Sequence, residues 1–232
     1  LQMGTEKFPK PIFLGKNINL WIPRGLVLKS VKMIESILTS IFNLKLNFKK
    51  PRFEETVLLL DLNPRPYQNL LQQIPWQNDE AIIFGKHHIT KRKVAWFGDK
   101  SYSYSYSGVT KQAHLWTPEL LQLKQKIEEL SSTTYNSCLL NLYHDGAEGM
   151  GWHSDAEKTL LENGTIASIT FGAERKFSFK HKVTKQRVDI LLENGSLLLM
   201  KGTTQKNWLH RLPPTKKVFS PRINLTFRTV II

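Results

Sequence analysis

Two residues with metal-binding side chains, His153 and Asp155, stand two positions apart in the C-terminal half of the chain. On a strand, residues two apart project to the same side, so this imidazole and this carboxylate could bind one metal ion together. His210 is the third candidate ligand by its place later in the chain. Two histidines and one carboxylate form the facial triad of non-haem iron(II) oxygenases, which leaves metal positions open for a keto acid and dioxygen. A His-x-Asp pair alone is weak evidence, because it often occurs by chance.

A second polar pattern occupies the segment from Arg222 to Arg228, which reads Arg-Ile-Asn-Leu-Thr-Phe-Arg. On a strand, Arg222, Asn224 and Arg228 fall on one face and the apolar residues on the other. A half-exposed strand with a solvated face would show the same alternation. However, a dicarboxylate such as 2-oxoglutarate needs a bidentate cation, and the planar guanidinium suits that task. Asn141 and Tyr143 are also two apart and could donate hydrogen bonds to the same co-substrate.

Short strands separated by turns dominate the chain after a first apolar segment at 56–62. The apolar alternation predicts strands over 81–84, 94–97, 102–106, 138–143, 165–171, 176–179, 188–192, 196–200 and 222–230. Helices are predicted over 65–74 and 118–130, the second with Thr117 as its N-cap. Many short strands with helical support indicate a mainly β sandwich or barrel.

The composition is that of a globular protein with a large basic surplus. Lysine and arginine number 33 against 19 acidic residues, a formal net charge of +14, which favours polyanionic partners such as nucleic acid. No apolar stretch approaches the length of a membrane span, so no membrane association is expected. The single cysteine, Cys138, lies in an apolar run and is expected to be a buried thiol.

The first 50 residues differ from the rest, because they are rich in lysine and poor in acidic residues. Helical periodicity runs over 25–48. This segment could be a targeting sequence, or extra sequence ahead of a native start at Met33. We expect residues 1–50 to be a basic extension, loosely packed or helical, and residues 51–232 to form the catalytic domain.

Taken together, these motifs resemble the AlkB family of iron(II)- and 2-oxoglutarate-dependent dioxygenases, and most of all its branch that repairs double-stranded DNA. The resemblance covers roughly residues 60–232. It does not include the N-terminal extension. The matching segments are 141–146, 151–157, 166–173, 175–182 and 221–228.

The resemblance implies a double-stranded β-helix, or jelly roll, and oxidative dealkylation of 1-methyladenine and 3-methylcytosine in DNA. The enzyme would bind iron(II) and consume 2-oxoglutarate and dioxygen, with succinate and carbon dioxide as co-products. His153, Asp155 and His210 would bind the iron. The co-substrate residues would be Asn141, Tyr143, Arg222, Asn224 and Arg228, and Arg228 would also lie near the iron and the base.

Chemistry on a base within a duplex requires flipping it out of the stack. By the resemblance, hairpins over about 76–110 would recognise the nucleotide, and an apolar tip at Ile83, Phe84 and Gly85 would fill the vacated space. Tyr106 would stack on the flipped base. Tyr104 and Glu157 would contact the base edge. An ordinary core strand and simple sheet packing remain alternative interpretations of the apolar tip and the tyrosines.

Four basic segments are candidate phosphate contacts: 91–93, 175–176, 180–182 and 216–217. The expected partner is alkylated double-stranded or single-stranded DNA, with RNA as an alternative substrate. A non-catalytic nucleic-acid-binding jelly roll is a further alternative. A zinc hydrolase is disfavoured, because the helical His-Glu-x-x-His spacing is absent. We expect an intracellular monomer, in a bacterial cytoplasm or a eukaryotic nucleus.

Overall fold

The computed structural model describes residues 12–13, 19–20, 55–59, 65–83, 86–106 and 109–231. Contacts within the chain divide it into two compact units, Leu1–Lys50 and Pro51–Ile232. In the first unit, β1 (Ile12–Phe13) pairs with β2 (Asn19–Leu20) in antiparallel orientation. The helical periodicity predicted over 25–48 and the possible start at Met33 lie outside the described residues.

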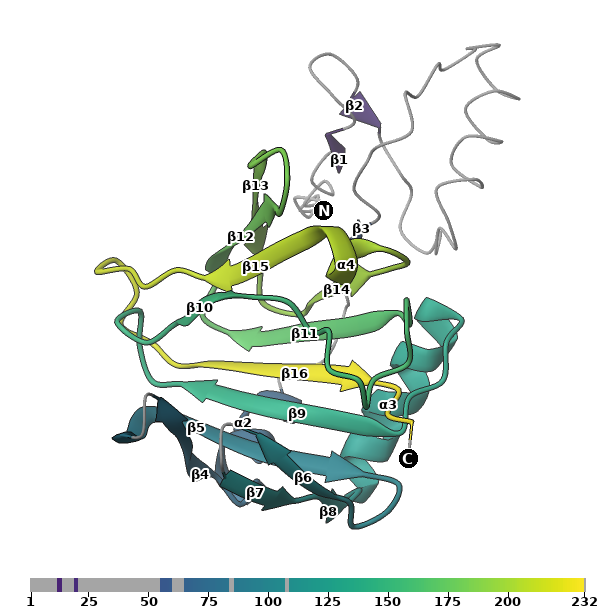
Figure 1. The fold of residues 1–232 in the computed structure, drawn as a ribbon, viewed down its shortest axis with the longest axis vertical. Helices are drawn as coiled ribbons and strands as arrows, with labels where there is room; N and C mark the ends of the chain where they lie inside the picture. Colours follow the sequence, from purple (N-terminus) through teal and green to yellow (C-terminus); the bar gives the residue numbers. More distant parts are fainter. Residues whose placement is uncertain are drawn as a thin grey trace, which may run out of the picture. The chain divides into compact units, whose positions relative to one another are not determined.

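An eight-stranded sheet forms the larger layer of the second unit (Figure 1). Its strand order is β3-β14-β11-β16-β9-β5-β4, and β8 pairs in parallel with β5. The strands are β3 (Glu55–Leu59), β4 (Gln77–Ile83), β5 (Lys86–Gly98), β8 (His114–Leu115), β9 (Ser137–Tyr143), β11 (Ile166–Gly172), β14 (Ser196–Met200) and β16 (Arg222–Arg228).

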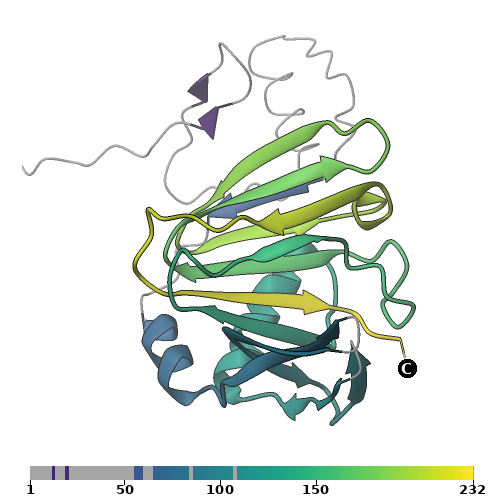
Figure 2. The ribbon, with the colours of Figure 1, turned by 60° about the vertical axis from the view of Figure 1, so that its left-hand side comes forward.

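A four-stranded antiparallel sheet, in the order β10-β15-β12-β13, forms the smaller layer (Figure 2). Its strands are β10 (Met150–His153), β12 (Arg175–His181), β13 (Arg187–Leu192) and β15 (Trp208–Leu212). A core cluster joins the layers, with Leu198 and Met200 of the larger sheet against Phe179 and Trp208 of the smaller one. A separate hairpin consists of β6 (Ser103–Tyr106) and β7 (Val109–Gln112). The predicted mainly β, jelly-roll fold is confirmed.

Helix α3 (Pro118–Ser131) covers the outer face of the larger sheet together with α2 (Arg65–Gln73). It begins where predicted, because the Thr117 side chain accepts a hydrogen bond from the backbone N–H of Leu120 at 3.2 Å. Its buried side chains are Leu120, Leu123, Ile127 and Ser131. Within the part of the chain that the structure describes, the remaining helix is the short α4 (Thr204–Asn207). Among the described residues, no helix is long and apolar enough to cross a membrane.

The face of the larger sheet under the helices is apolar, whereas the opposite face carries polar residues on β9, β11 and β16, and this asymmetry positions the site. Leu140, Leu225 and other alternate residues pack against the helices, at 0% exposure. Their neighbours Asn141 and Asn224 point to the opposite side, which faces the smaller sheet. A register slip of one residue would place Arg222 in the apolar helical layer, so burial of that layer fixes the register.

The predicted strands and both predicted helices are present, with shifted ends. The sequence did not predict β1, β2, β3, β7, β8, β10, β15 or α4 as separate elements. Two of these, β10 and β15, carry the candidate ligands His153 and His210, whereas Asp155 follows the end of β10. Cys138 is fully buried, as predicted, and burial raises the pKa of its thiol well above the usual range.

Candidate metal and co-substrate site

The three predicted metal ligands lie together between the sheets. His153 ends β10 and pairs in register with His210 on β15. The two Nε2 atoms are 3.1 Å apart, and Asp155 Oδ1 lies 3.8 Å from the Nε2 of His153 and 3.9 Å from that of His210. Ligands bound to one metal at adjacent positions are separated by about 3 Å, so modest closure around an ion would complete the set.

Asp155 reaches this position by a route that the sequence did not predict. The expectation that one strand carries both His153 and Asp155 was wrong, because β10 ends at His153. A tight bend follows, in which the N–H of Ala156 donates to the carbonyl of Ser154 at 3.1 Å. The N–H of Asp155 donates to Gln205 Oε1 of α4 at 2.9 Å. The carboxylate is therefore placed by a neighbouring helix rather than by strand geometry.

Both imidazoles are oriented by their surroundings. His153 Nδ1 donates to the carbonyl of Gly151 at 2.8 Å, which leaves Nε2 with a free lone pair for a metal. The ring of His210 packs against those of Phe177 and Phe179, with centroid distances of 5.5 and 6.1 Å. Burial lowers the pKa of His210 to about 4, so the ring is neutral at physiological pH, as a metal ligand must be.

Arg228 keeps Asp155 ionised. Its Nε and Nη2 donate to Asp155 Oδ2 at 3.0 and 2.7 Å, so Oδ1 remains directed at the two histidines. Burial by itself would raise the pKa of Asp155, but its ion pair with Arg228 outweighs burial and lowers that pKa to about 2. Two neutral imidazoles and one carboxylate are the donor set of non-haem iron(II), so these residues fit that metal.

A row of polar residues crosses the inner face of the larger sheet beside the triad. Arg222 is paired in register with Tyr143 on β9 and with Gly172 on β11. The next inward position of β16, Asn224, is paired with Asn141 and with Thr170. The predicted co-substrate residues therefore share one surface.

Arg222 is the strongest indication of an anionic ligand. It is 2% exposed, and its Nη2 donates to Thr170 Oγ1 at 2.8 Å. Its Nε has no hydrogen-bond partner, and no carboxylate among the described residues pairs with it. Burial lowers the pKa of Arg222 to about 10, yet it stays charged. A buried charge normally has a partner, so this one fits the distal carboxylate of 2-oxoglutarate.

The two predicted asparagines differ in what they offer. Asn224 is engaged within the protein: Nδ2 donates to Ser168 Oγ at 2.8 Å and to the carbonyl of Ile169 at 3.0 Å, and Oδ1 accepts from Thr226. Asn141 accepts a hydrogen bond from Arg92 through Oδ1. Only Asn141 therefore has donor capacity that the described residues leave unused.

Two predicted phosphate contacts are buried instead. Arg92 is 8% exposed and binds Asp79 and Asn141 inside the domain. Arg175 is 2% exposed and donates to backbone carbonyls of two loops, those of Asp145, Gly146, Glu148 and Pro213. Because both side chains are buried, neither can reach a phosphate. The prediction failed because the sequence does not distinguish a cation that bridges loops from one on the surface.

The sequence analysis did not identify three residues that hold the site residues in place, namely Ser168, Thr170 and Gln205. The polar alternation within apolar β11 could have indicated Ser168 and Thr170.

The predicted base-recognition residues are only partly described. Ile83 pairs with Lys86 at the end of the β4–β5 hairpin, while Phe84 and Gly85 lie outside the described residues. Tyr104 and Tyr106 lie on β6. Glu157 borders, with Asp155 and Arg228, a cavity of about 620 Å³, and its Oε2 is buried without a partner among the described residues.

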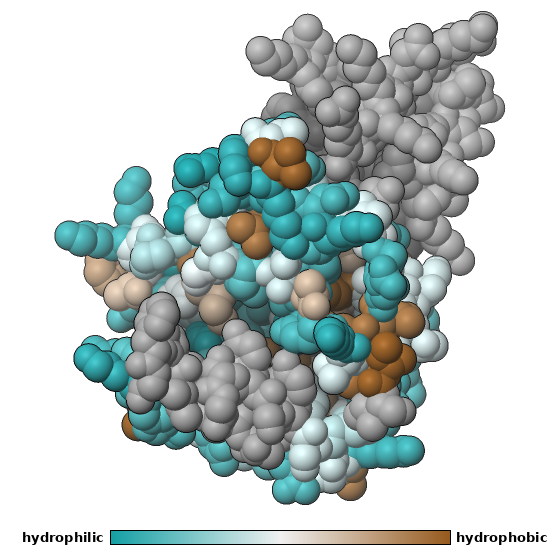
Figure 3. All heavy atoms as spheres, viewed as in Figure 1, coloured by the Kyte–Doolittle hydropathy of each residue, from teal (hydrophilic) through white to brown (hydrophobic). Residues whose placement is uncertain are grey.

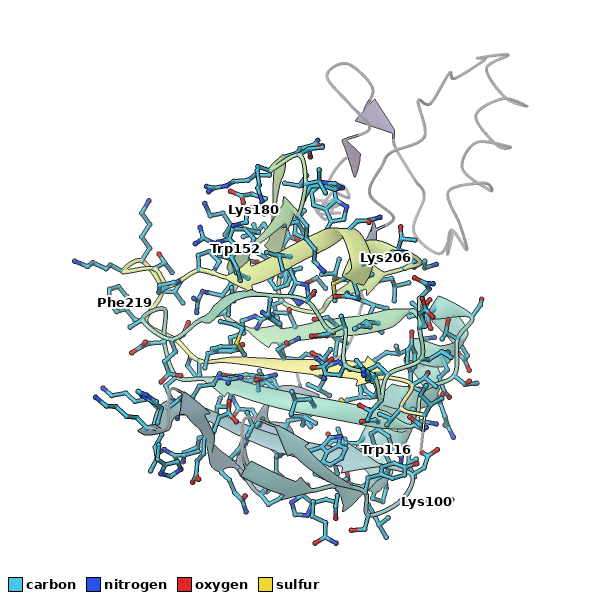
Figure 4. The ribbon with its side chains drawn as sticks, viewed as in Figure 1. Lys100, Trp116, Trp152, Lys180, Lys206 and Phe219 are labelled. Carbon is cyan, nitrogen blue, oxygen red and sulfur yellow. The ribbon has the colours of Figure 1, made fainter. Side chains whose placement is uncertain are left out.

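The outer face of the smaller sheet is basic. Lys180 Nζ and Arg211 Cζ lie over the ring of Trp152, at 4.5 and 4.6 Å from its centroid. Figure 4 labels Trp152 and Lys180. Hydrophilic residues cover much of the face seen in Figure 3, with few apolar patches among the coloured atoms.

Comparisons with known proteins show which proteins this chain resembles. The family model described as "2OG-Fe(II) oxygenase superfamily" matches residues 65–228. Human "DNA oxidative demethylase ALKBH2" is 39% identical over 158 residues, which are 65% of this chain and 60% of that relative. Bovine "Alpha-ketoglutarate-dependent dioxygenase alkB homolog 3" is 39% identical over 173 residues, 71% of this chain and 60% of that relative.

A more distant relative and a solved structure extend the likeness. The Arabidopsis thaliana "DNA oxidative demethylase ALKBH2" is 31% identical over 192 residues, 71% of this chain and 61% of that relative. A structure titled "The structure of OsALKBH1" matches with a TM-score of 0.52 and 15% identity, over 77% of this chain and 99% of that one, which supports the fold. The chain spans about 60% of the length of these curated relatives.

Proposed function

Because this chain belongs to the 2OG-Fe(II) oxygenase superfamily, and within it to the AlkB family, we propose that it removes alkyl groups from nucleic-acid bases by oxidation. The substrates we assign are 1-methyladenine and 3-methylcytosine in DNA. The observation that carries this proposal is the buried, carboxylate-free Arg222 on the same polar surface as a His-Asp-His triad. A metal site with a purely structural role would not need the buried guanidinium of Arg222 beside it.

His153, Asp155 and His210 would hold iron(II) between the two sheets. When bound with 2-oxoglutarate and dioxygen, this iron supplies the oxidation that hydroxylates the alkyl carbon, so that the group leaves as an aldehyde. The protein's part is positional. Gly151 and Arg228 fix the donor atoms of His153 and Asp155 so that they converge. Such preorganisation avoids the cost of ordering ligands during the reaction.

Arg222 would pair with the distal carboxylate of 2-oxoglutarate, with its guanidinium held in place by Thr170. Asn141 and Tyr143 would donate hydrogen bonds to the same molecule. Asn224 supports this surface from within, because its amide is already bonded to β11. In this arrangement the co-substrate would have one orientation, with its distal carboxylate at Arg222 and its keto acid toward the triad.

On the nucleic-acid side, we assign the hairpin tip at Ile83, Phe84 and Gly85 to the space left by a flipped base. Tyr106 would stack on that base. Tyr104 and Glu157 would contact its edge, where a carboxylate suits the cationic 1-methyladenine and 3-methylcytosine. The overall charge of +14 favours the phosphate backbone. Exposed or partly exposed cations for this contact are Lys180, Lys182, Lys216 and Lys217.

The decisive test is mass spectrometry of a duplex containing 1-methyladenine after incubation with the protein, iron(II) and 2-oxoglutarate. We expect loss of the methyl mass together with succinate formation. The His153→Ala variant should lose turnover but retain most of its DNA affinity, because the substitution removes a metal ligand and no phosphate contact. Wild-type turnover in that variant, or no demethylation by the wild type, would refute the proposal.

A substrate panel separates DNA from RNA and duplex from single strands. The human relative named ALKBH2 and the bovine relative named alkB homolog 3 are both 39% identical to this chain, so turnover on methylated duplex, single-stranded DNA and RNA should be compared directly. The Phe84→Ala variant should lose more activity on duplex than on single strands. Equal losses on both would contradict the assignment of the apolar tip to the space left by the flipped base.

A further inference from the structure

The β4–β5 hairpin contains an irregularity that turns one cation inward. Asn78 pairs with Lys93 and Glu80 pairs with Ile89, so Asp79 alone faces the β5 residues 90–92. Two hydrogen bonds hold this bulge: Asn78 Nδ2 donates to the carbonyl of Thr90 at 3.0 Å, and Thr90 Oγ1 donates to that of Arg92 at 2.9 Å. Bulges commonly redirect a side chain next to a functional site. Here Arg92 is buried while Lys91 is exposed.

The guanidinium of Arg92 joins the hairpin to the co-substrate surface. Nη2 binds Asp79 Oδ2 and Nη1 donates to Asn141 Oδ1. Its central carbon lies 6.0 Å from the ring centroid of Tyr143, and the same ring is 5.5 Å from Arg222. Two residues predicted to bind the co-substrate, Asn141 and Tyr143, thus contact Arg92 directly.

This contact determines which end of the Asn141 amide is available. Arginine has donors and no acceptor, so the amide must present its oxygen to Arg92. The NH2 group of the Asn141 amide then points away from Arg92, and no described residue accepts a hydrogen bond from it. A keto acid has only acceptors to offer, so the orientation that Arg92 imposes is the one that 2-oxoglutarate requires.

We propose that Arg92 is a positioning residue that locks the Asn141 amide in the orientation that binds 2-oxoglutarate and ties this amide to Asp79 of the β4–β5 hairpin. The inference rests on the proposed use of 2-oxoglutarate. Because Asp79 already pairs with the guanidinium, Arg92 contributes orientation rather than net charge, whereas Arg222 supplies the charge. The hairpin assigned to the nucleotide and the co-substrate site therefore share one buried connection.

The test measures 2-oxoglutarate binding directly, without nucleic acid or turnover. The full chain is loaded with Mn(II), kept free of oxygen and titrated with 2-oxoglutarate by calorimetry, while Mn(II) affinity is followed by electron paramagnetic resonance. We expect Arg92→Met to weaken 2-oxoglutarate binding by about 10-fold, the effect of one misplaced buried hydrogen bond, with Mn(II) affinity unchanged. The matched control, Arg187→Met, removes an exposed arginine on β13 and should leave both affinities unchanged.

Two further variants distinguish orientation from charge and from misfolding. Arg92→Lys keeps a cation beside Asp79 but loses the second donor arm, so it should weaken binding nearly as much as Arg92→Met. In an Asn141→Ala background, Arg92→Met should add less than about a 2-fold effect, because its target is gone. Wild-type affinity in Arg92→Lys, or full additivity with Asn141→Ala, would overturn the inference. If the wild type itself does not bind 2-oxoglutarate, the proposed function fails instead.

Discussion

The two ends of β16 carry an arginine each, on the same face of the same strand, and the two side chains are in opposite electrostatic situations. At the C-terminal end, Arg228 forms a two-donor ion pair with Asp155. At the N-terminal end, Arg222 is more deeply buried, and the described residues offer it only the hydroxyl of Thr170 and the ring of Tyr143. Within the described part of the chain, Arg228 therefore has a carboxylate partner and Arg222 has none.

This difference indicates which charges serve the fold and which serve a ligand. A paired, buried cation such as Arg228 holds its partner in place, and its removal leaves a buried carboxylate without a counter-charge. An unpaired one such as Arg222 costs the folded protein desolvation energy until an anion arrives. The same residue type thus has a structural role at one end of the strand and a binding role at the other. Four substitutions test that division.

The largest effect is expected for His210→Ala, at the Arg228 end. This variant loses one of three convergent donors, so metal affinity should fall more than 100-fold, beyond the roughly 10- to 100-fold typical of outer-shell changes. Turnover should fall to background. Titration with Mn(II) and an assay for succinate measure both. A variant that binds Mn(II) normally would show that the triad is not the metal site.

Arg228→Met should destabilise the fold by about 3 kcal/mol, because it leaves the buried Asp155 carboxylate without its main partner. Urea denaturation of the metal-free protein measures the free energy of unfolding. The double variant with Asp155→Asn should recover part of that loss, since no stranded charge remains. Unchanged stability in the single variant would mean that this ion pair does not hold the site.

Arg222→Met should behave in the opposite way. The free energy of unfolding should stay the same or rise, because a buried unpaired charge is removed. Binding of 2-oxoglutarate should weaken about 100-fold, the loss expected for a charge-assisted bidentate pair. Calorimetry and urea denaturation on the same preparation test both parts. A large loss of stability with little change in binding would reverse the roles assigned to the two arginines.

Thr170→Val should give the smallest effect. It removes one hydrogen bond that orients Arg222 while keeping the shape of the side chain. Binding of 2-oxoglutarate should weaken about 5-fold, which corresponds to about 1 kcal/mol. Ser168→Ala is the matched control, because its hydroxyl supports Asn224 rather than Arg222. A larger loss in Ser168→Ala than in Thr170→Val would place the co-substrate closer to Asn224.

The sequence by itself determined the strands and faces of the larger sheet. Apolar and polar residues alternate along 138–143 and 222–228, and burial of the apolar set against α3 leaves one register. Asn141, Tyr143 and Arg222 consequently share a surface, as strand periodicity predicts. The types and order of three residues also indicated the candidate metal ligands, although one strand does not carry both His153 and Asp155.

Only the tertiary structure decided which cations are buried and what they bind. Lys91, Arg92 and Lys93 form one basic segment in the sequence, yet a bulge opposite Asp79 turns Arg92 alone into the domain. Likewise, the backbone of Asp155 is held by Gln205, fifty positions away in the chain. Such contacts depend on how distant segments approach one another, and local periodicity carries no information about that distance.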